Sequence, residues 1–452
     1  MPVSEEHKPL AVVEVVNKVK VDSYKSMSFV LSPERRRSVM HRRSSSVELD
    51  IGHKYVPFKQ EDEFTLELIC TQIRSMLLLY ADAGSLGMYL SHNQITRSLL
   101  EMHKVSSTTR SLHHQMSSMN LDVDLMSNTI KRGKKINLDS PDFDVFAHSD
   151  EQLVAFAIEI FRRCGVTDQQ VDTCKNFVVA VRTRYLKNPF HNWKHGFCVF
   201  HHSYLILSEV SKKKGWSRNS ILYLLVSALS HDVGHPGNTN DFEINSQSER
   251  AVRYNHQSVL ENHHCSLCFQ IMRDPSCNLF KDLEGEKFLR MKNTIINLIL
   301  ATDMKHHFKM QSKMRSMSNE KKAEEVKGGS SGRQQVEMEI LIHSADLANQ
   351  GLVWSISSVW ADRVCDEFQA QAESETKLGL PVAPFMRGLE KPTGRAKLQM
   401  SFIDAILVPW WDLVRTVMSS KLVEKICENL GKNRKRYSEV KDDKTALSKL
   451  KF

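Results

Sequence analysis

Histidines gather at four short stretches of the chain, in three of them together with carboxylates, and these residue types bind metal ions. The stretches are NPFHNWKHGF, SHDVGHPG, VLENHHC and LIHSADLAN, and they contain His191, His195, His231, Asp232, His235, Glu261, His343 and Asp346. Imidazole nitrogens with carboxylate oxygens suit zinc or another borderline divalent ion, whereas carboxylates with water suit magnesium or manganese. Because His191 and His195 are four residues apart, they share one helix face. Spacing alone therefore assigns both of them to a metal.

The second stretch follows an apolar run, ILYLLVSAL at 221–229, that ends almost directly at His231, Asp232 and His235. A buried helix end with three titratable side chains is costly unless something binds there. A metal ion is the candidate, and its remaining ligands have to come from the other stretches.

Most of the 20 histidines carry no such signal, and a lone histidine is usually exposed or capped by a backbone carbonyl. Adjacent histidines on a helix point about 100° apart, so at most one of each pair faces a given site. We assign the paired histidines outside the main motifs to structural positions: His201, His202, His263, His264, His306 and His307.

Composition narrows the class of protein. The 452 residues include no stretch approaching the ~20 apolar residues that span a bilayer, and the first residues lack a secretory signal pattern. Nine cysteines without a repeating spacing indicate reduced thiols and a cytoplasmic location, and Cys265 and Cys268 are interpreted as small core residues. The net charge is +9, but the basic residues gather at the ends of the chain and in one loop, so we expect no nucleic-acid interface.

From about residue 140 to 430 the apolar residues recur at helical spacing, and alternating strand patterns are nearly absent. The chain is therefore expected to be all-α. Helices are predicted over 168–187, 194–211, 219–231, 257–273, 286–303, 335–347, 357–376 and 400–429, after a first helix that starts at Ser149. The charged, then Gly/Ser-rich segment 313–335 is expected to be a mobile surface loop. The Pro/Gly-rich segment 378–397 is expected to be a second loop at a site wall.

The ends of the chain show weaker patterns. Residues 1–60 are basic and expected to be disordered, and Ser38 and Ser45 each follow two arginines, as in substrates of basophilic protein kinases. The segment 61–135 contains an amphipathic helix at 64–80, able to pack on the main domain or to form a homodimer, followed by a linker. The main domain is expected at 136–435 and a basic tail at 436–452.

Six ordered motifs resemble the class I 3′,5′-cyclic nucleotide phosphodiesterases: FHNWKHGF, SHDVGHPGNTN, LENHH, ATDM, HSADLAN and LQMSFIDAILVPWW. The resemblance covers residues 140–430, and passages such as NPFHN and LGLPVAPFM are most similar to the high-affinity cGMP-specific type. It implies a compact multi-helix, HD-domain-like catalytic fold. It also implies hydrolysis of cGMP or cAMP to the 5′-monophosphate by a two-metal mechanism.

The resemblance also implies a role for each site residue, and it separates the two histidines that spacing alone groups together. His191 would be the general acid. The first ion, zinc, would be held by His195, His231, Asp232 and Asp346. Asp232 would bridge to a second ion, magnesium or manganese, which His235, Glu261 and Thr302 would support. The purine would be contacted by Asn349, Val364, Gln399 and Phe402.

Two positions depart from the family pattern: Gly234 stands where a second aspartate of an H-D-x-D-H motif is expected, and Arg387 stands where an acidic residue is common. This leaves two alternatives open. The chain could be another His-Asp metal phosphohydrolase, which the purine residues Gln399 and Phe402 argue against, or a cyclic-nucleotide-binding regulator that has lost catalysis. The choice between cGMP and cAMP also stays open, because the amide of Gln399 can serve either purine by turning over.

Overall fold

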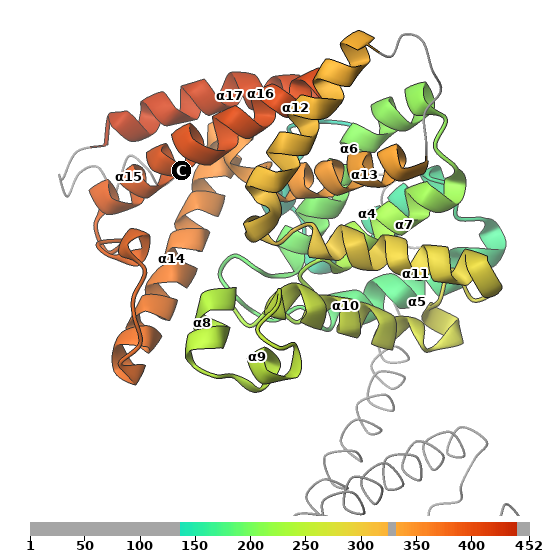
Figure 1. Cartoon of the computed structure of the whole chain (residues 1–452), viewed down its shortest axis with the longest axis horizontal. Coiled ribbons are helices and arrows are strands. Elements are labelled where there is room, and N and C mark those ends of the chain that lie inside the picture. Colours follow the sequence, from blue (N-terminus) through green and yellow to red (C-terminus); the bar gives the residue numbers. More distant parts are fainter. Residues whose placement is uncertain (1–135, 324–330, 441–452) are drawn as a thin grey trace, which may run out of the picture. The chain divides into compact units, whose positions relative to one another are not determined.

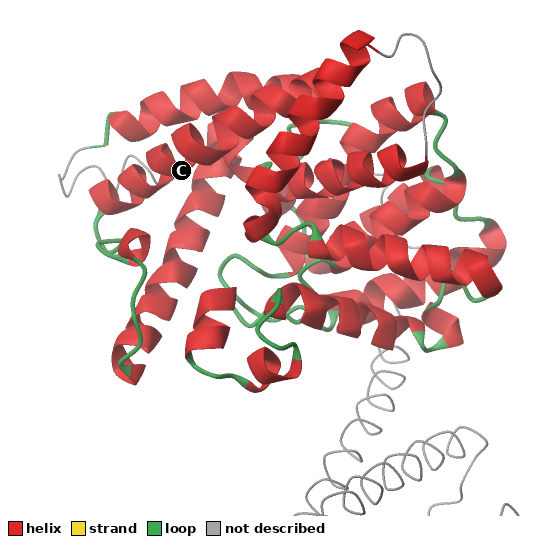
Figure 2. Ribbon diagram, viewed as in Figure 1, coloured by secondary structure: helices red, strands yellow, loops and turns green. Residues whose placement is uncertain are grey.

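The computed structural model describes residues 136–323 and 331–440, which form helices joined by turns and loops (Figures 1 and 2). No strand occurs in either described range, which confirms the expected all-α class. The predicted kinase sites, amphipathic helix and linker all fall within 1–135 and lie outside the described residues.

The helices have the following bounds. The first half contains α4 (Asp150–Arg163), α5 (Val171–Arg182), α6 (Trp193–Lys214), α7 (Arg218–Ser230), α8 (Asn240–Asn245), α9 (Glu249–Arg253), α10 (Val259–Met272) and α11 (Gly285–Leu300). The second half contains α12 (His307–Ala323), α13 (Ser331–Asp346), α14 (Trp354–Leu378), α15 (Pro392–Phe402), a π-helical turn (Ile403–Leu407), α16 (Val408–Val417) and α17 (Lys421–Ser438).

Side-chain caps begin α4, at the residue that the sequence predicts, and α6. The Ser149 hydroxyl accepts from the Gln152 amide, and the Gln152 side chain accepts in return from the Ser149 amide, which together make a capping box at α4. At α6, the Asn192 side-chain oxygen accepts from the backbone amides of Lys194 and His195. This second cap fixes the helical turn that carries His195.

The centre of the domain is formed by α6, α7 and α13, which pack against one another. Every residue of α7 from Leu222 to Ser230 is buried, as expected for the apolar run that precedes His231. Cys265 and Cys268 are buried too, which confirms their interpretation as core residues. Among the described residues, no helix is long and apolar enough to cross a membrane.

The loop predicted at 313–335 is wrong over most of its length. Helix α12 continues to Ala323 and α13 begins at Ser331. Met310, Met314 and Met317 form a buried stripe at helical spacing, and α12 packs against α16. The surrounding lysines and serines hid this stripe in the sequence.

The helical stretch predicted at 400–429 is interrupted. After the π-helical turn, the second residue of α16 is Pro409, which has no amide to donate to the preceding turn. The chain then breaks at Met418–Ser420, and Ser420 caps α17 by accepting from the Val423 amide. Helix α17 ends at Ser438, three residues inside the predicted basic tail.

A close approach fixes how α6 crosses α7. The Tyr185 hydroxyl donates to the Leu229 carbonyl of α7 at 3.0 Å, and its ring lies against α6 at Gly196. A β-carbon at Gly196 would lie only 2.4 Å from the Tyr185 oxygen. Glycine beside His195 is therefore what lets Tyr185 connect the two helices.

We expect Gly196→Ala to lower the free energy of unfolding by about 1–3 kcal/mol, because the added methyl overpacks a buried contact. Gly431→Ala is the matched control, since its β-carbon in the middle of α17 would meet no atom of the described residues within 4 Å. That change should raise stability by about 0.5–1 kcal/mol through helix propensity. Urea unfolding measures both, and a Gly196→Ala protein as stable as the native one would contradict the close approach.

Candidate metal centre

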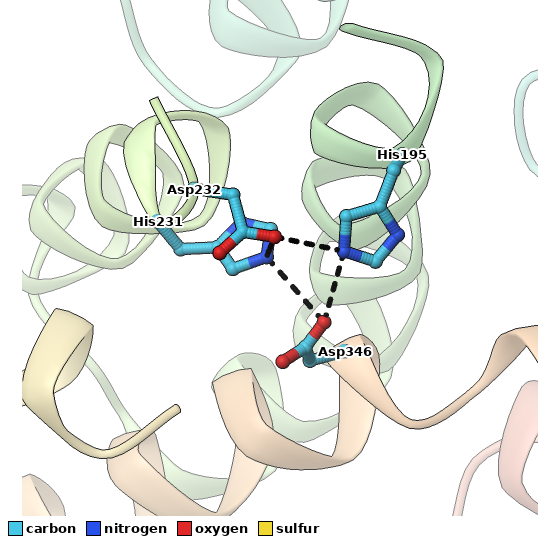
Figure 3. A group of neighbouring side chains, drawn as sticks. All are labelled: His195, His231, Asp232 and Asp346. Atoms are coloured by element: carbon cyan, nitrogen blue, oxygen red, sulfur yellow. Dashed lines mark ion pairs between the residues drawn. The ribbon is translucent and has the colours of Figure 1, made fainter. Parts of the chain in front are cut away.

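Four of the expected site residues converge from the three central helices. His195 extends from the first turn of α6, His231 and Asp232 follow the end of α7, and Asp346 is the last residue of α13 (Figure 3). His195 Nε2 lies 3.2 Å from Asp232 Oδ2 and 3.1 Å from Asp346 Oδ1. His231 Nε2 lies 3.1 and 3.4 Å from the same two oxygens.

These distances fit a bound cation. Ligand atoms about 2.0–2.1 Å from a tetrahedral ion lie roughly 3.3–3.4 Å from one another, close to the observed spacings. The Nε2 atoms of His195 and His231 are buried and have no hydrogen-bond partner among the described residues. The Nδ1 of His231 donates to the Ala228 carbonyl at 2.9 Å, which leaves the Nε2 lone pair facing the carboxylates. The donor set therefore suits a divalent metal ion.

The electrostatics of the group also favour a positive charge. Burial by itself would lower the pKa of His231, but the carboxylates of Asp232 and Asp346 outweigh it and raise that pKa well above its usual value. Burial would raise the pKa of Asp232, yet the neighbouring imidazoles hold it well below its usual value. Protons on imidazoles and a divalent cation are alternative ways to offset the two carboxylates.

Of the residues expected to support a second ion, Glu261 and His235 lie near Asp232. Both oxygens of Glu261 accept from the Asn240 side-chain amide, at 3.1 and 3.0 Å. Burial, and then the charge of Asp303, raise the pKa of Glu261 to about 7. The Thr302 hydroxyl donates to the Ile299 carbonyl at 2.7 Å, which leaves its lone pairs free to accept. This side of the site is thus rich in acidic and accepting groups.

His235 is buried beside the same aspartate. Its Nδ1 accepts from the Gly237 amide at 3.0 Å. Burial, and then the nearby His191, lower its pKa well below the usual range, so His235 is neutral and its other nitrogen is the donor.

His191 belongs to a different group from His195, although the two are four residues apart. Its Nδ1 contacts a carboxylate oxygen of Glu367 from α14, and its ring stacks on His235 with centroids 3.9 Å apart. The other Glu367 oxygen accepts from the amides of Phe190 and His191, at 3.0 and 3.1 Å. Burial by itself would lower the pKa of His191, but the Glu367 carboxylate outweighs burial and raises that pKa to about 9. His191 is therefore a cation at neutral pH whose Nε2 remains available as a donor.

Two residues at the site escaped the sequence analysis. Glu367 gave no signal because α14 carries several acidic residues, and its contact with His191 joins segments 176 residues apart. His264 was assigned to a structural position, and its Nδ1 does donate to the Val233 carbonyl at 2.9 Å. Its Nε2, however, lies 3.6 Å from Asp232 Oδ1, at the site itself. The HH pair alone could not show which histidine turns inward.

The other paired histidines are largely structural. His201 and His202 are buried and donate to the carbonyls of Leu138 and Ala345, as expected. His307 instead lies against an imidazole, with its Nδ1 3.1 Å from His343 Nε2.

The residues expected at the purine come mainly from α14 and α15, which pack together. Gln399 is buried, and its Nε2 lies 3.8 Å from the Cys365 sulfur. Val364 precedes that cysteine on α14, and Phe402 ends α15; both are partly buried against the core. Asn349 begins a separate short turn that packs on α14, and its amide contacts His195.

Gly234 is explained by its backbone and its surroundings. Its φ of +75° is in the left-handed region that favours glycine. A β-carbon there would lie 2.3 Å from Leu267 Cδ1 and 3.5 Å from His263 Nε2. The space that a second aspartate would need is therefore taken by Leu267.

Fold and site together define a class of helical proteins with a His/Asp group suited to a divalent metal ion. The chain belongs to the 3′5′-cyclic nucleotide phosphodiesterase family, whose model matches residues 190–430, more than half of the sequence. Members of this family use divalent metal ions, in agreement with the His/Asp groups of the site.

Several relatives support this membership. The human high affinity cGMP-specific 3′,5′-cyclic phosphodiesterase 9A is 33% identical over 316 residues, 69% of this chain and 52% of that protein. The rat dual specificity calcium/calmodulin-dependent phosphodiesterase 1B is 31% identical over 67% of this chain and 56% of its own length. This chain thus spans about half the length of these relatives. The phosphodiesterase domain of the Salpingoeca rosetta rhodopsin phosphodiesterase matches with a TM-score of 0.63 and 34% identity, over 70% of this chain and 94% of that domain.

We expect Glu367→Gln to lower the pKa of His191 from about 9 toward the ordinary range, because the amide keeps the shape but removes the counter-charge. Glu373→Gln is the matched control, since Glu373 is an exposed carboxylate on the same helix. NMR titration of the His191 ring protons measures both. A His191 pKa that is unmoved in Glu367→Gln would contradict the assigned ion pair.

Proposed function

We propose that this protein hydrolyses 3′,5′-cyclic nucleotides, cGMP or cAMP, to the 5′-monophosphates and so terminates cyclic nucleotide signalling. The observation that carries the proposal is the division of the site into two parts. His195, His231, Asp232 and Asp346 form a group suited to a cation, and His191 stands beside it as a separate, positively charged proton donor.

The proposed ions are zinc at the four-residue group and magnesium or manganese beside it. Zinc suits two imidazoles and two carboxylates, whereas an oxygen-rich, hydrated position suits magnesium or manganese. Asp232 would be shared by both ions, and His235, Glu261 and Thr302 would hold the water around the second. When bound, the two ions neutralise the phosphodiester and lower the pKa of the attacking water.

The protein's own groups supply the remaining chemistry. Water attacks phosphorus, the bond from phosphorus to O3′ breaks, and O3′ needs a proton as it leaves. His191 can give that proton from Nε2, because Glu367 holds Nδ1 and keeps the imidazole charged. Asp346 would orient the attacking water as well as bind the cation.

The base of the nucleotide would lie between α14 and α15. Val364 and Phe402 offer apolar surface for the two faces of a purine, and Gln399 offers an amide whose oxygen has no hydrogen-bond partner among the described residues. An amide can donate or accept, so Gln399 is compatible with guanine and adenine. The cGMP-specific relative favours cGMP, and the dual-specificity relative keeps cAMP open.

The wider organisation of the chain is part of the proposal. Residues 136–435 would be the catalytic domain, and 1–135 would carry regulation through a homodimer contact or phosphorylation at Ser38 or Ser45. Eight described cysteines are free thiols, which supports a reducing, cytoplasmic location.

The test is to give the purified full chain cAMP, cGMP and a generic phosphodiester in parallel, with zinc and magnesium or manganese. We expect turnover of at least one cyclic nucleotide, loss of activity on chelation and little activity on the generic ester. Preference for the generic ester would indicate a different His-Asp phosphohydrolase. Tight binding of a cyclic nucleotide without turnover would indicate a regulator that has lost catalysis.

In the same assay, the His191→Ala variant tests the proposed role of the general acid. It should lose about 10²- to 10⁴-fold in kcat, the usual contribution of a general acid, and keep its zinc. Loss of zinc instead would mean that His191 is a ligand and that the proposed division of roles is wrong.

A further inference from the structure

Asn349 contacts one of the four side chains that form the candidate metal centre. It begins a short turn, Asn349–Gly351, three residues after Asp346, and its side chain is completely buried. Its Nδ2 lies 3.2 Å from His195 Nδ1. Its Oδ1 is buried and has no hydrogen-bond partner among the described residues.

His195 differs from three other buried histidines in what holds its Nδ1. The Nδ1 atoms of His231, His264 and His343 each donate to a backbone carbonyl, at 2.9 Å in all three cases. A carbonyl can only accept, so it holds the proton on Nδ1 and leaves the lone pair on Nε2. His195 has no such carbonyl among its hydrogen bonds in the described residues, and the Asn349 amide stands in that place.

A side-chain amide can accept a hydrogen bond through its oxygen, as the carbonyl does, and it can also donate one through its nitrogen. Oxygen and nitrogen of an asparagine side chain exchange places when the amide turns by 180°. With Nδ2 toward His195, the imidazole proton is on Nε2 and faces Asp232 and Asp346. With Oδ1 toward His195, the proton is on Nδ1 and the Nε2 lone pair faces the position of a cation.

We propose that Asn349 is a positioning residue for His195, whose side-chain oxygen accepts the Nδ1 proton of His195 and so directs the Nε2 lone pair to the bound metal ion. This inference rests on the proposed metal centre. The turn, the burial and the absence of another partner for Oδ1 in the described residues all support it. Mutation of a hydrogen-bond partner of a metal-ligating histidine typically lowers metal affinity 10- to 100-fold.

The structure offers a matched control for the turn itself. Asn433 of α17 is also buried, and its Nδ2 donates to the carbonyls of Gln350 and Leu352, each at 2.9 Å. Asn433→Ala therefore loosens the same turn without removing the group that faces His195.

The experiment measures zinc affinity of the full chain by competition with a chromophoric chelator, alongside thermal unfolding and the ratio of kcat/KM for cGMP and cAMP with saturating zinc. Asn349→Ala should weaken zinc binding about 10- to 100-fold and leave the nucleotide ratio within about twofold. Asn349→Asp should keep zinc affinity within a few-fold, because a carboxylate oxygen still accepts from Nδ1. Asn433→Ala should lower the unfolding temperature and keep native zinc affinity.

Three results would overturn the inference. Native zinc affinity in a folded Asn349→Ala protein would show that the amide does not position His195, particularly if the nucleotide ratio changed. Equal losses in Asn349→Ala and Asn433→Ala would show a general effect of the turn. If the native chain binds no zinc, the metal centre fails and the inference fails with it, whereas the first two results leave the proposed function intact.

Discussion

Two carboxylates and two imidazoles from three helices lie with their ligand atoms within 4.8 Å of one another. At that separation and an effective dielectric constant of about 20, two carboxylate charges repel by about 3.5 kcal/mol. A cation bound between the carboxylates removes this repulsion. The way in which α6, α7 and α13 cross therefore depends on the cation that binds where they meet. Each surrounding contact can be understood by the ligand that it holds in place.

Several of these contacts work by removing freedom from a side chain. Asn192 caps the turn that carries His195, Tyr185 connects that turn to α7, and the Ala228 carbonyl fixes the proton of His231. Glu367 likewise engages the Nδ1 of His191 and keeps the positive charge of that imidazole apart from the metal ligands. One nitrogen of each histidine is thus engaged away from the site, which leaves the other for binding or for proton transfer.

The sequence could predict the parts of this site that are local. The apolar run that ends at His231 and Asp232 indicated a buried helix end, and the helical spacing of 357–376 indicated α14. It could not predict contacts that depend on tertiary packing, such as Glu367 reaching His191 or Asn349 reaching His195 across 154 residues. Spacing grouped His191 with His195, although the contact with Glu367 holds His191 outside the group of four converging side chains. Local composition also misled at 313–323, where the charged residues obscured a buried methionine stripe in α12.

The central claim is that the four converging side chains hold a metal ion. Anomalous diffraction from crystals of the zinc-loaded protein, recorded above and below the zinc edge, tests it most directly. The account predicts one strong difference peak about 2.0–2.2 Å from His195 Nε2, His231 Nε2 and the facing oxygens of Asp232 and Asp346. A peak ligated by His191, or the lack of any peak between these four residues, would contradict it.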